Sequence, residues 1–250
     1  MKQKLQEATY GEVRQQKYDI AILPWGATEP HNYHLPYLTD CYLAEAIALD
    51  AATQAAEKGV HCMVLPPIPF GAQNPGQHDY PFCIHTRHST QFAILSDITA
   101  SLYRQGFRKL LIINGHGGNS FKSMIRDLSF DYPEFKILVA DWFAIIPEQS
   151  YFENKDDHAG EMETSVLMHY HPGLVDLSTA GDGKAIPFNI DTLNRKVAWT
   201  PRIWNKTTAD TGVGDPSKST AEKGGRYARA VTGELAELLV EFAQNELYQI

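Results

Sequence analysis

Short apolar runs alternate with longer amphipathic stretches along the chain. Four of the runs predict buried strands, since they lack the in-and-out alternation of a strand with one solvent face. These runs are residues 20–24 (IAILP), 60–68, 109–113 (KLLII) and 136–140 (KILVA). The stretches that predict helices are 40–58, 90–104, 121–130, 161–169 and 221–247. Strands that alternate with helices favour an α/β fold with a largely parallel sheet covered on both faces.

No internal repeat or flexible linker interrupts this pattern, so we expect a single domain over residues 1–250. Only residues 181–214 form a long irregular stretch. In a compact domain a segment of this kind is usually functional. We therefore predict a lid or an interface arm there.

Composition narrows the possible functions. Apolar residues make up 43% of the chain and charged residues 21%, as in an average globular domain. The net charge of −8 argues against nucleic acid as a partner, because an acidic surface repels phosphates. We expect no membrane span and no signal peptide, since no apolar run is long enough and the first residues are polar. The three scattered cysteines (Cys41, Cys62 and Cys83) predict reduced thiols and a cytoplasmic protein.

The segment 24–40 (PWGATEPHNYHLPYLTD) directly follows the first predicted strand and is rich in possible ligands. Glu29 and His31 lie in a loop stiffened by Pro30. Asp40 lies at the expected start of a helix, where the helix dipole favours a charged carboxylate. Any one of these side chains alone is more often a polar surface residue. Together, in one short loop beyond a strand, they favour a ligand site.

The segment 114–119 (NGHGGN) follows the third predicted strand. Its glycines permit sharp turns and close backbone approach around His116. A histidine at the carboxyl end of a buried strand is well placed to bind a metal. The alternative is a glycine-rich turn whose histidine caps a helix. Phosphate binding is disfavoured, because the GxGxxG spacing and a following lysine are both missing.

The segment 156–165 (DDHAGEMETS) carries a third set of candidates. His158 and Glu161 are three residues apart and share a face if one helix covers both. Glu163 then points roughly opposite to Glu161, behind the ligands or into an interface. An acidic helix start would also explain both glutamates.

These segments together give a nitrogen and oxygen ligand set without cysteine. Such a set suits zinc or manganese. The predicted ligands are Glu29, His31, Asp40, His116 and Glu161. Five ligands crowd one ion, so we expect two divalent metals per chain, about 3.5–4 Å apart and bridged by a carboxylate. Two metals that activate a water and polarise a carbonyl point to hydrolysis.

Four segments resemble signatures of the creatininase family: PWGATEPHNYHLPYLTD, NGHGGN, HAGEMETS and, at 211–224, TGVGDPSKSTAEKG. The resemblance implies a single three-layer αβα domain, a two-metal centre and a homohexamer. It assigns Glu29, Asp40 and His116 to one metal, and His31, Asp40 and Glu161 to the other, with Asp40 as the bridge. It also implies that His158 carries a proton during the reaction.

The chain departs from creatininase at several positions. Gly117 and Gly118 stand where creatininase has a tyrosine and a metal-binding glutamate, so Glu161 would supply the missing ligand. No tryptophan closely precedes His158, which leaves Trp142 as a candidate for lining the pocket. The metal site thus resembles the family more closely than the substrate pocket does.

The leading hypothesis is hydrolysis of a C–N amide bond in a small cyclic or formylated molecule, with His158 donating the proton to the leaving nitrogen. The alternatives are a peptidase, a hydrolase of a cyclic keto-sugar, and a metal-binding protein without turnover. The last is disfavoured because a structural site needs no proton carrier and is usually rich in cysteine.

Overall fold

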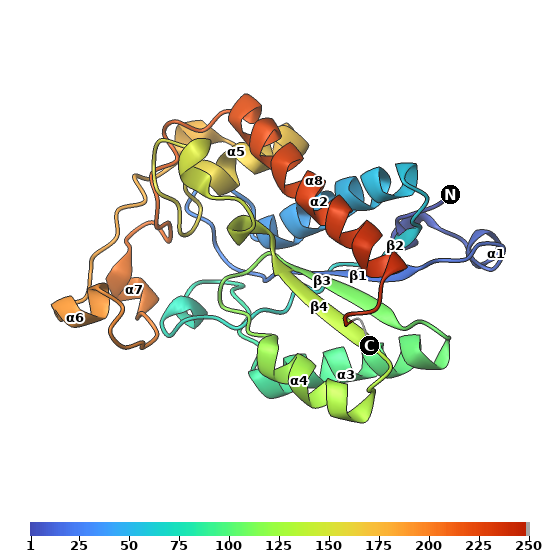
Figure 1. The fold of residues 1–250 in the computed structure, drawn as a ribbon. Helices are drawn as coiled ribbons and strands as arrows, with labels where there is room; N and C mark the ends of the chain where they lie inside the picture. Colours follow the sequence, from blue (N-terminus) through green and yellow to red (C-terminus); the bar gives the residue numbers. More distant parts are fainter. Residues whose placement is uncertain (249–250) are drawn as a thin grey trace.

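Four parallel strands in the order β2-β1-β3-β4 form the centre of the protein (Figure 1). The structure is a computed structural model and describes residues 1–248. The strands are β1 (Ile20–Trp25), β2 (Cys62–Val64), β3 (Lys109–Asn114) and β4 (Lys136–Asp141). All three strand pairings are parallel, as the apolar runs predict.

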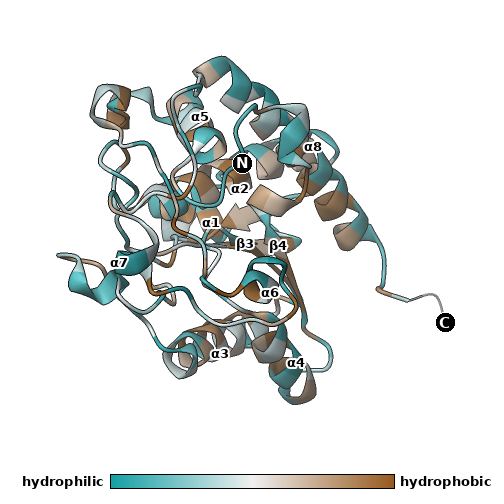
Figure 2. Cartoon of the chain, turned by 90° about the vertical axis from the view of Figure 1, so that its left-hand side faces the viewer, coloured by the Kyte–Doolittle hydropathy of each residue, from teal (hydrophilic) through white to brown (hydrophobic). Residues whose placement is uncertain are grey.

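Helices cover both faces of this sheet and complete three αβα layers. One layer consists of α2 (Thr39–Glu57), α5 (Glu161–Tyr170) and α8 (Ala221–Gln244). The opposite layer consists of α3 (His88–Arg104) and α4 (Lys122–Asp131). Two separate apolar clusters fill the spaces between the sheet and these layers. Figure 2 shows the apolar character of the strands between the helices. The predicted α/β fold is therefore confirmed.

The second predicted strand is shorter than expected. Strand β2 ends at Val64, whereas the apolar run continues to residue 68. Prolines at 66 and 67 have no N–H to donate to a ladder, so the chain leaves the sheet there. It returns only at Ile68, which makes an isolated bridge with Trp25.

The irregular segment 181–214 contains two single-turn helices, α6 (Asp191–Asn194) and α7 (Trp204–Thr207). It projects from the carboxyl end of the sheet as an arm that crosses beyond the strand ends (Figure 1). A further short helix, α1 (Tyr10–Val13), precedes the sheet. Within residues 1–248, none of the helices is both long and apolar enough to span a membrane.

The strand order creates a crevice for a ligand at one point of the sheet. The chain runs from β1 outward to β2, and then returns to place β3 on the other side of β1. The loops after β1 and β3 consequently diverge and leave a crevice between them, which is where ligands bind in open α/β sheets. The loop after β3 lies so close to the start of α2 that a side chain on Gly115 would meet the backbone oxygen of Asp40 at 2.4 Å.

Candidate metal centre

Four of the five predicted ligands meet in this crevice. Glu29 and His31 lie in the loop after β1, Asp40 in the first turn of α2, and His116 in the loop after β3. All four are buried, with between 0% and 7% of each residue exposed. Removing so many ionisable groups from water is costly unless they are paired or bind a metal.

Glu29, Asp40 and His116 form a first group of potential ligands. The Nε2 of His116 lies 2.8 Å from the carbonyl oxygen of Ala72. A carbonyl only accepts, so Nε2 carries the hydrogen and Nδ1 has a free lone pair. That Nδ1 lies 2.8 Å from Glu29 Oε1 and 3.2 Å from Asp40 Oδ2. Three acceptor atoms that face one another require a cation between them, either a metal ion or a proton on Nδ1.

Hydrogen bonding elsewhere does not satisfy these carboxylate oxygens. Among the described residues, Glu29 Oε1 and Asp40 Oδ2 are buried and accept no hydrogen bond. Burial opposes a charge on His116, but the carboxylates of Glu29 and Asp40 outweigh it and raise the pKa of His116 well above its usual value. The group therefore attracts a positive charge strongly.

His31, Asp40 and Glu163 form a second group. The Nδ1 of His31 faces the carbonyl oxygen of Glu29 at 3.1 Å, which leaves Nε2 facing Asp40 Oδ1 at 2.9 Å. Burial lowers the pKa of His31, but the Asp40 carboxylate outweighs it and raises that pKa to about 10. Asp40 thus presents one oxygen to each group, as a bridging ligand does.

The structure does not bring Glu161 to either group. Its Oε1 lies 2.6 Å from Lys223 Nζ on α8. Its Oε2 accepts hydrogen bonds from the backbone N–H groups of Glu153 and Asn154. Every carboxylate oxygen of Glu161 therefore already has partners away from the ligand groups.

Glu163, and not Glu161, lies with His31 and Asp40 in the second group of potential ligands. It lies on the face of α5 that points into the crevice and accepts a hydrogen bond from the N–H of Ala159 at 2.6 Å. Asp156 holds this turn by accepting from the N–H of Gly160 and of Glu163, both at 3.0 Å. Burial and the Asp156 carboxylate outweigh the charge of His31 and raise the pKa of Glu163 to about 8.

His158 lies beside both groups but outside helix α5. The helix begins at Glu161, so the expectation that His158 and Glu161 share a helical face is not met. The Nε2 of His158 lies 3.0 Å from the carbonyl oxygen of Pro30, and its Nδ1 lies 3.8 Å from Glu29 Oε1. Burial, followed by the charge of His31, lowers the pKa of His158. His158 can also form a ligand triad with Glu29 and His31.

His34, which lies in the same loop after β1, belongs to none of these triads. Its Nε2 faces the hydroxyl of Thr164 at 2.8 Å. Burial, followed by the charge of His31, lowers its pKa to about 4, so His34 is neutral at pH 7. Its hydrogen bond ties the loop after β1 to α5.

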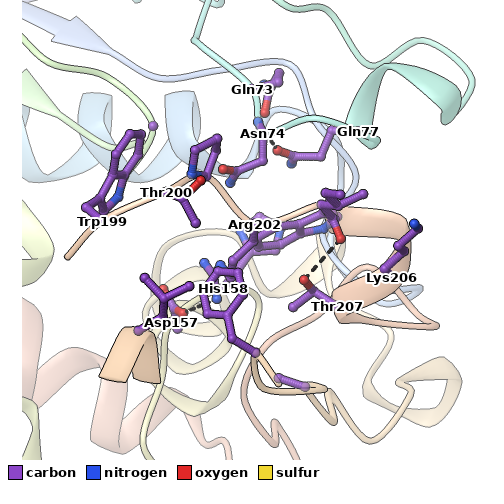
Figure 3. Close-up of a pocket in the computed structure, with 18 of the residues that line it drawn as sticks. Gln73, Asn74, Gln77, Asp157, His158, Trp199, Thr200, Arg202, Lys206 and Thr207 are labelled. Carbon is purple, nitrogen blue, oxygen red and sulfur yellow. Dashed lines mark hydrogen bonds and ion pairs between the residues drawn. The ribbon is translucent and has the colours of Figure 1, made fainter. Parts of the chain in front are cut away.

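A pocket of about 1320 Å³ opens onto Glu29, His116 and His158. Figure 3 shows Gln73, Asn74 and Gln77 on one side of this pocket, across from Trp199, Arg202 and His158. The predicted arm 181–214 supplies most of the outer wall.

Trp142 does not line this pocket, contrary to the suggestion from the sequence. It is 0% exposed and packs edge-on against Tyr227 in the core between the sheet and α8. Trp199 and Trp204 line the pocket instead. Both come from the irregular arm, where the sequence offers no periodic pattern that would reveal which side chains face inward.

Comparison with known proteins identifies relatives over most of the chain. The family model described as creatininase, creatinine amidohydrolase, matches residues 6–239. A crystal structure from Bacteroides fragilis, provisionally named a creatinine amidohydrolase, is 60% identical, with a TM-score of 0.98 over 99% of this chain and 98% of that one. The mycofactocin precursor peptide peptidase of Mycobacterium ulcerans is 31% identical over 82% of this chain and 78% of its own length.

Other relatives act on different substrates. The creatinine amidohydrolase of Pseudomonas putida is 25% identical over 65% of this chain and 68% of its own length. A hydrolase of 3-dehydro-scyllo-inosose and a deformylase of a formylamino-pyrimidinone 5′-monophosphate are also similar. Creatininase structures that share the fold include one of Zn-Zn type and one with manganese, both with a TM-score of 0.76.

Proposed function

This chain belongs to the creatininase family and is a hydrolase of the amidohydrolase type, and we propose that it uses two divalent metals to hydrolyse a C–N amide bond. The observation that carries this proposal is the placement of Asp40 between two ligand groups. Its Oδ1 faces His31 and its Oδ2 faces His116. Zinc or manganese suits these imidazole and carboxylate donors.

In this proposal Glu29, Asp40 and His116 hold one metal, and His31, Asp40 and Glu163 hold the other. Glu163 replaces the Glu161 of the sequence prediction, since the Glu161 carboxylate is already paired with Lys223. When bound, the two metals would lower the pKa of a water and polarise the substrate carbonyl. The backbone oxygens of Ala72 and Glu29 orient His116 and His31, because each accepts from the ring nitrogen that faces away from the carboxylates.

His158 is the proposed proton carrier. Its Nε2–H donates to Pro30, so the free lone pair lies on Nδ1, which faces the ligand groups and the pocket. From there Nδ1 can accept a proton and deliver it to the leaving nitrogen of an amide. Its lowered pKa keeps the ring neutral before the reaction, as a proton acceptor must be.

The size of the pocket favours a peptidase as the second candidate. Pockets for small molecules commonly measure about 300–1,000 Å³, whereas this pocket measures about 1320 Å³. Such space accommodates a short peptide as well as a small cyclic amide. The similarity to the mycofactocin precursor peptide peptidase points in the same direction.

The remaining alternatives receive less support. A keto-sugar substrate rests on the similarity to the inosose hydrolase alone. A metal-binding role without turnover does not explain why Glu29, His116 and His158 all border an open pocket. Free Cys41, Cys62 and Cys83 support the proposal of a reducing, cytoplasmic location.

The proposal can be tested by assaying zinc- or manganese-loaded protein against cyclic amides, formamides and short peptides, with amine release as the readout. We expect turnover of at least one class, its loss after chelation and its recovery on adding metal. A second arm of the test uses His158→Gln, which keeps the proposed metal ligands but removes the proton carrier and should therefore lose turnover. Turnover that survives complete metal removal, or equal turnover in His158→Gln, would contradict the mechanism.

A further inference from the structure

The arm 181–214 is attached to the chain beside the metal centre. The backbone N–H of His158 donates to Val213 at 2.9 Å, and the N–H of Val213 donates back to His158 at 2.8 Å. Arg202 lies 2.6 Å from Asp157, the residue before His158. The arm therefore contacts His158 through its backbone and the preceding Asp157 through a side chain.

Trp204 is the side chain of the arm that reaches the ring of His158. The two ring centroids are 5.3 Å apart, and the ring planes are nearly perpendicular at 86°. On the inner side, the ring of His31 lies 4.3 Å from that of His158 at 34°. The imidazole of His158 is thus bounded by aromatic rings of His31 and Trp204, and both contacts are with buried residues.

Trp204 is itself held firmly, although it belongs to a largely exposed arm. It is 2% exposed. Its indole N–H donates to the carbonyl of Thr211 at 3.1 Å, and its backbone N–H donates to Pro75 at 2.7 Å. The guanidinium of Arg202 lies 4.7 Å from its ring centroid. A side chain anchored on two sides can restrain a neighbour; one free to rotate cannot.

The ring of His158 needs such a restraint. One hydrogen bond, from Nε2 to the carbonyl of Pro30, selects which nitrogen carries the hydrogen. A single hydrogen bond opposes a full turn of the ring but leaves it able to tilt about that contact. Such a tilt would carry Nδ1 away from Glu29 and the pocket.

We propose that Trp204 is a positioning residue that holds the ring of His158 with Nδ1 directed at the metal centre. The inference rests on the proposed function of His158 as the proton carrier. Trp204 acts through His158 and contributes no chemistry of its own. The arm thereby couples the outer wall of the substrate pocket to the orientation of the proton carrier.

The test compares Trp204→Ala and Trp204→Phe with a matched control, Trp142→Phe, which alters a buried core tryptophan that packs on Tyr227 rather than on His158. We expect Trp204→Ala to retain its metals and to lose about 10–100-fold in kcat with little change in KM, as for residues that orient a functional group. Trp204→Phe keeps an aromatic ring and should recover part of the loss. Trp142→Phe should match the unmodified protein.

A double-mutant comparison shows whether the effect passes through His158. In a His158→Gln background, adding Trp204→Ala should lower kcat no further. An equal further loss in that background, or a change confined to KM, would overturn the inference and make Trp204 a substrate contact.

A spectroscopic readout keeps the inference testable if no substrate is found. In zinc-loaded protein with ¹⁵N-labelled histidine, His158 should give a hydrogen-bonded Nε2–H signal and an unprotonated Nδ1 signal. Trp204→Ala should broaden or shift both signals, and Trp142→Phe should leave them unchanged. Unchanged His158 signals in folded Trp204→Ala would refute the positioning role, whereas missing turnover with the expected signals would count only against the proposed function.

Discussion

Replacing each of the two glutamates of α5 by glutamine separates the two possible ligand assignments. Glu161 and Glu163 are two residues apart and both are buried, yet their partners differ. Glu161 pairs with Lys223 at 2.6 Å, whereas Glu163 lies with His31 and Asp40. We expect Glu163→Gln to lose metal without unfolding, and Glu161→Gln to lose stability while retaining its metal.

The magnitudes follow from these partners. Glu161→Gln removes a hydrogen bond between charged groups, which costs about 1.5–3 kcal/mol in free energy of unfolding. For a chain of this length that is a fall in Tm of roughly 3–12 °C. Glu163 has a pKa of about 8 and is mostly protonated at pH 7 in the metal-free protein. Glutamine resembles that neutral acid in shape, so metal-free stability should barely change.

The effect of Glu163→Gln on metal binding should be large. Replacing a residue that merely orients a ligand lowers metal affinity about 10–100-fold. Replacing a direct ligand should therefore lower it by about 100-fold or more. Elemental analysis and thermal unfolding, each with and without zinc, give the two readouts for both variants. Loss of zinc in Glu161→Gln together with full zinc content in Glu163→Gln would contradict this ligand assignment.

Three further predictions concern the proton carrier, pH and assembly. His158→Ala should retain its metal content and lose about 10²–10⁴-fold in kcat; loss of metal would instead make His158 a ligand. Metal affinity should rise with pH, because at pH 7 His31, with a pKa of about 10, and Glu163, with a pKa of about 8, hold protons that the metal must displace. Calorimetry in buffers of different ionisation enthalpy should therefore report proton release, and no release would contradict the raised pKa values. In light scattering we expect a hexamer with contacts from α8 and the arm 181–214, and a monomer at micromolar concentration would refute this.

The raised pKa of His31 also affects the stability of the metal-free protein. The pKa of His31 is raised above its unfolded value, so the stabilisation that its charge provides is fully present below about pH 6.5. It is lost as the pH rises through about 10. Metal-free protein should therefore lose stability on the alkaline side, in the range where metal binding becomes stronger.

The sequence predicts the sheet and the larger helices because both depend on local apolar patterns. The run KLLII is short and continuously apolar, which favours a buried strand, and β3 covers Lys109–Asn114. The position of Glu29 and His116 beyond strand ends also follows, since each lies in a loop after a predicted strand. The strand order, which brings β1 next to β3, is a property of the whole fold and completes the site.

The third segment shows where local reasoning fails. Whether Glu161 or Glu163 faces the metals depends on where α5 begins and on which face it turns to the sheet. The helix begins only at Glu161, so spacing from His158 gives no direction. Lys223 is distant in sequence and reaches Glu161 only because α8 packs tightly on α5, where a side chain on Gly224 would collide with the backbone of Ser165. No pattern within residues 156–165 contains that information.

The most direct test of the two-metal centre is the metal content of Asp40→Ala beside that of the unmodified protein. Asp40 offers one carboxylate oxygen to each ligand group, so its loss should affect both metals equally. After zinc loading and dialysis, elemental analysis should find close to two zinc ions per chain in the unmodified protein and almost none in a folded Asp40→Ala variant. Full retention of one zinc ion in that variant would contradict Asp40 as the bridge, and with it the proposed centre.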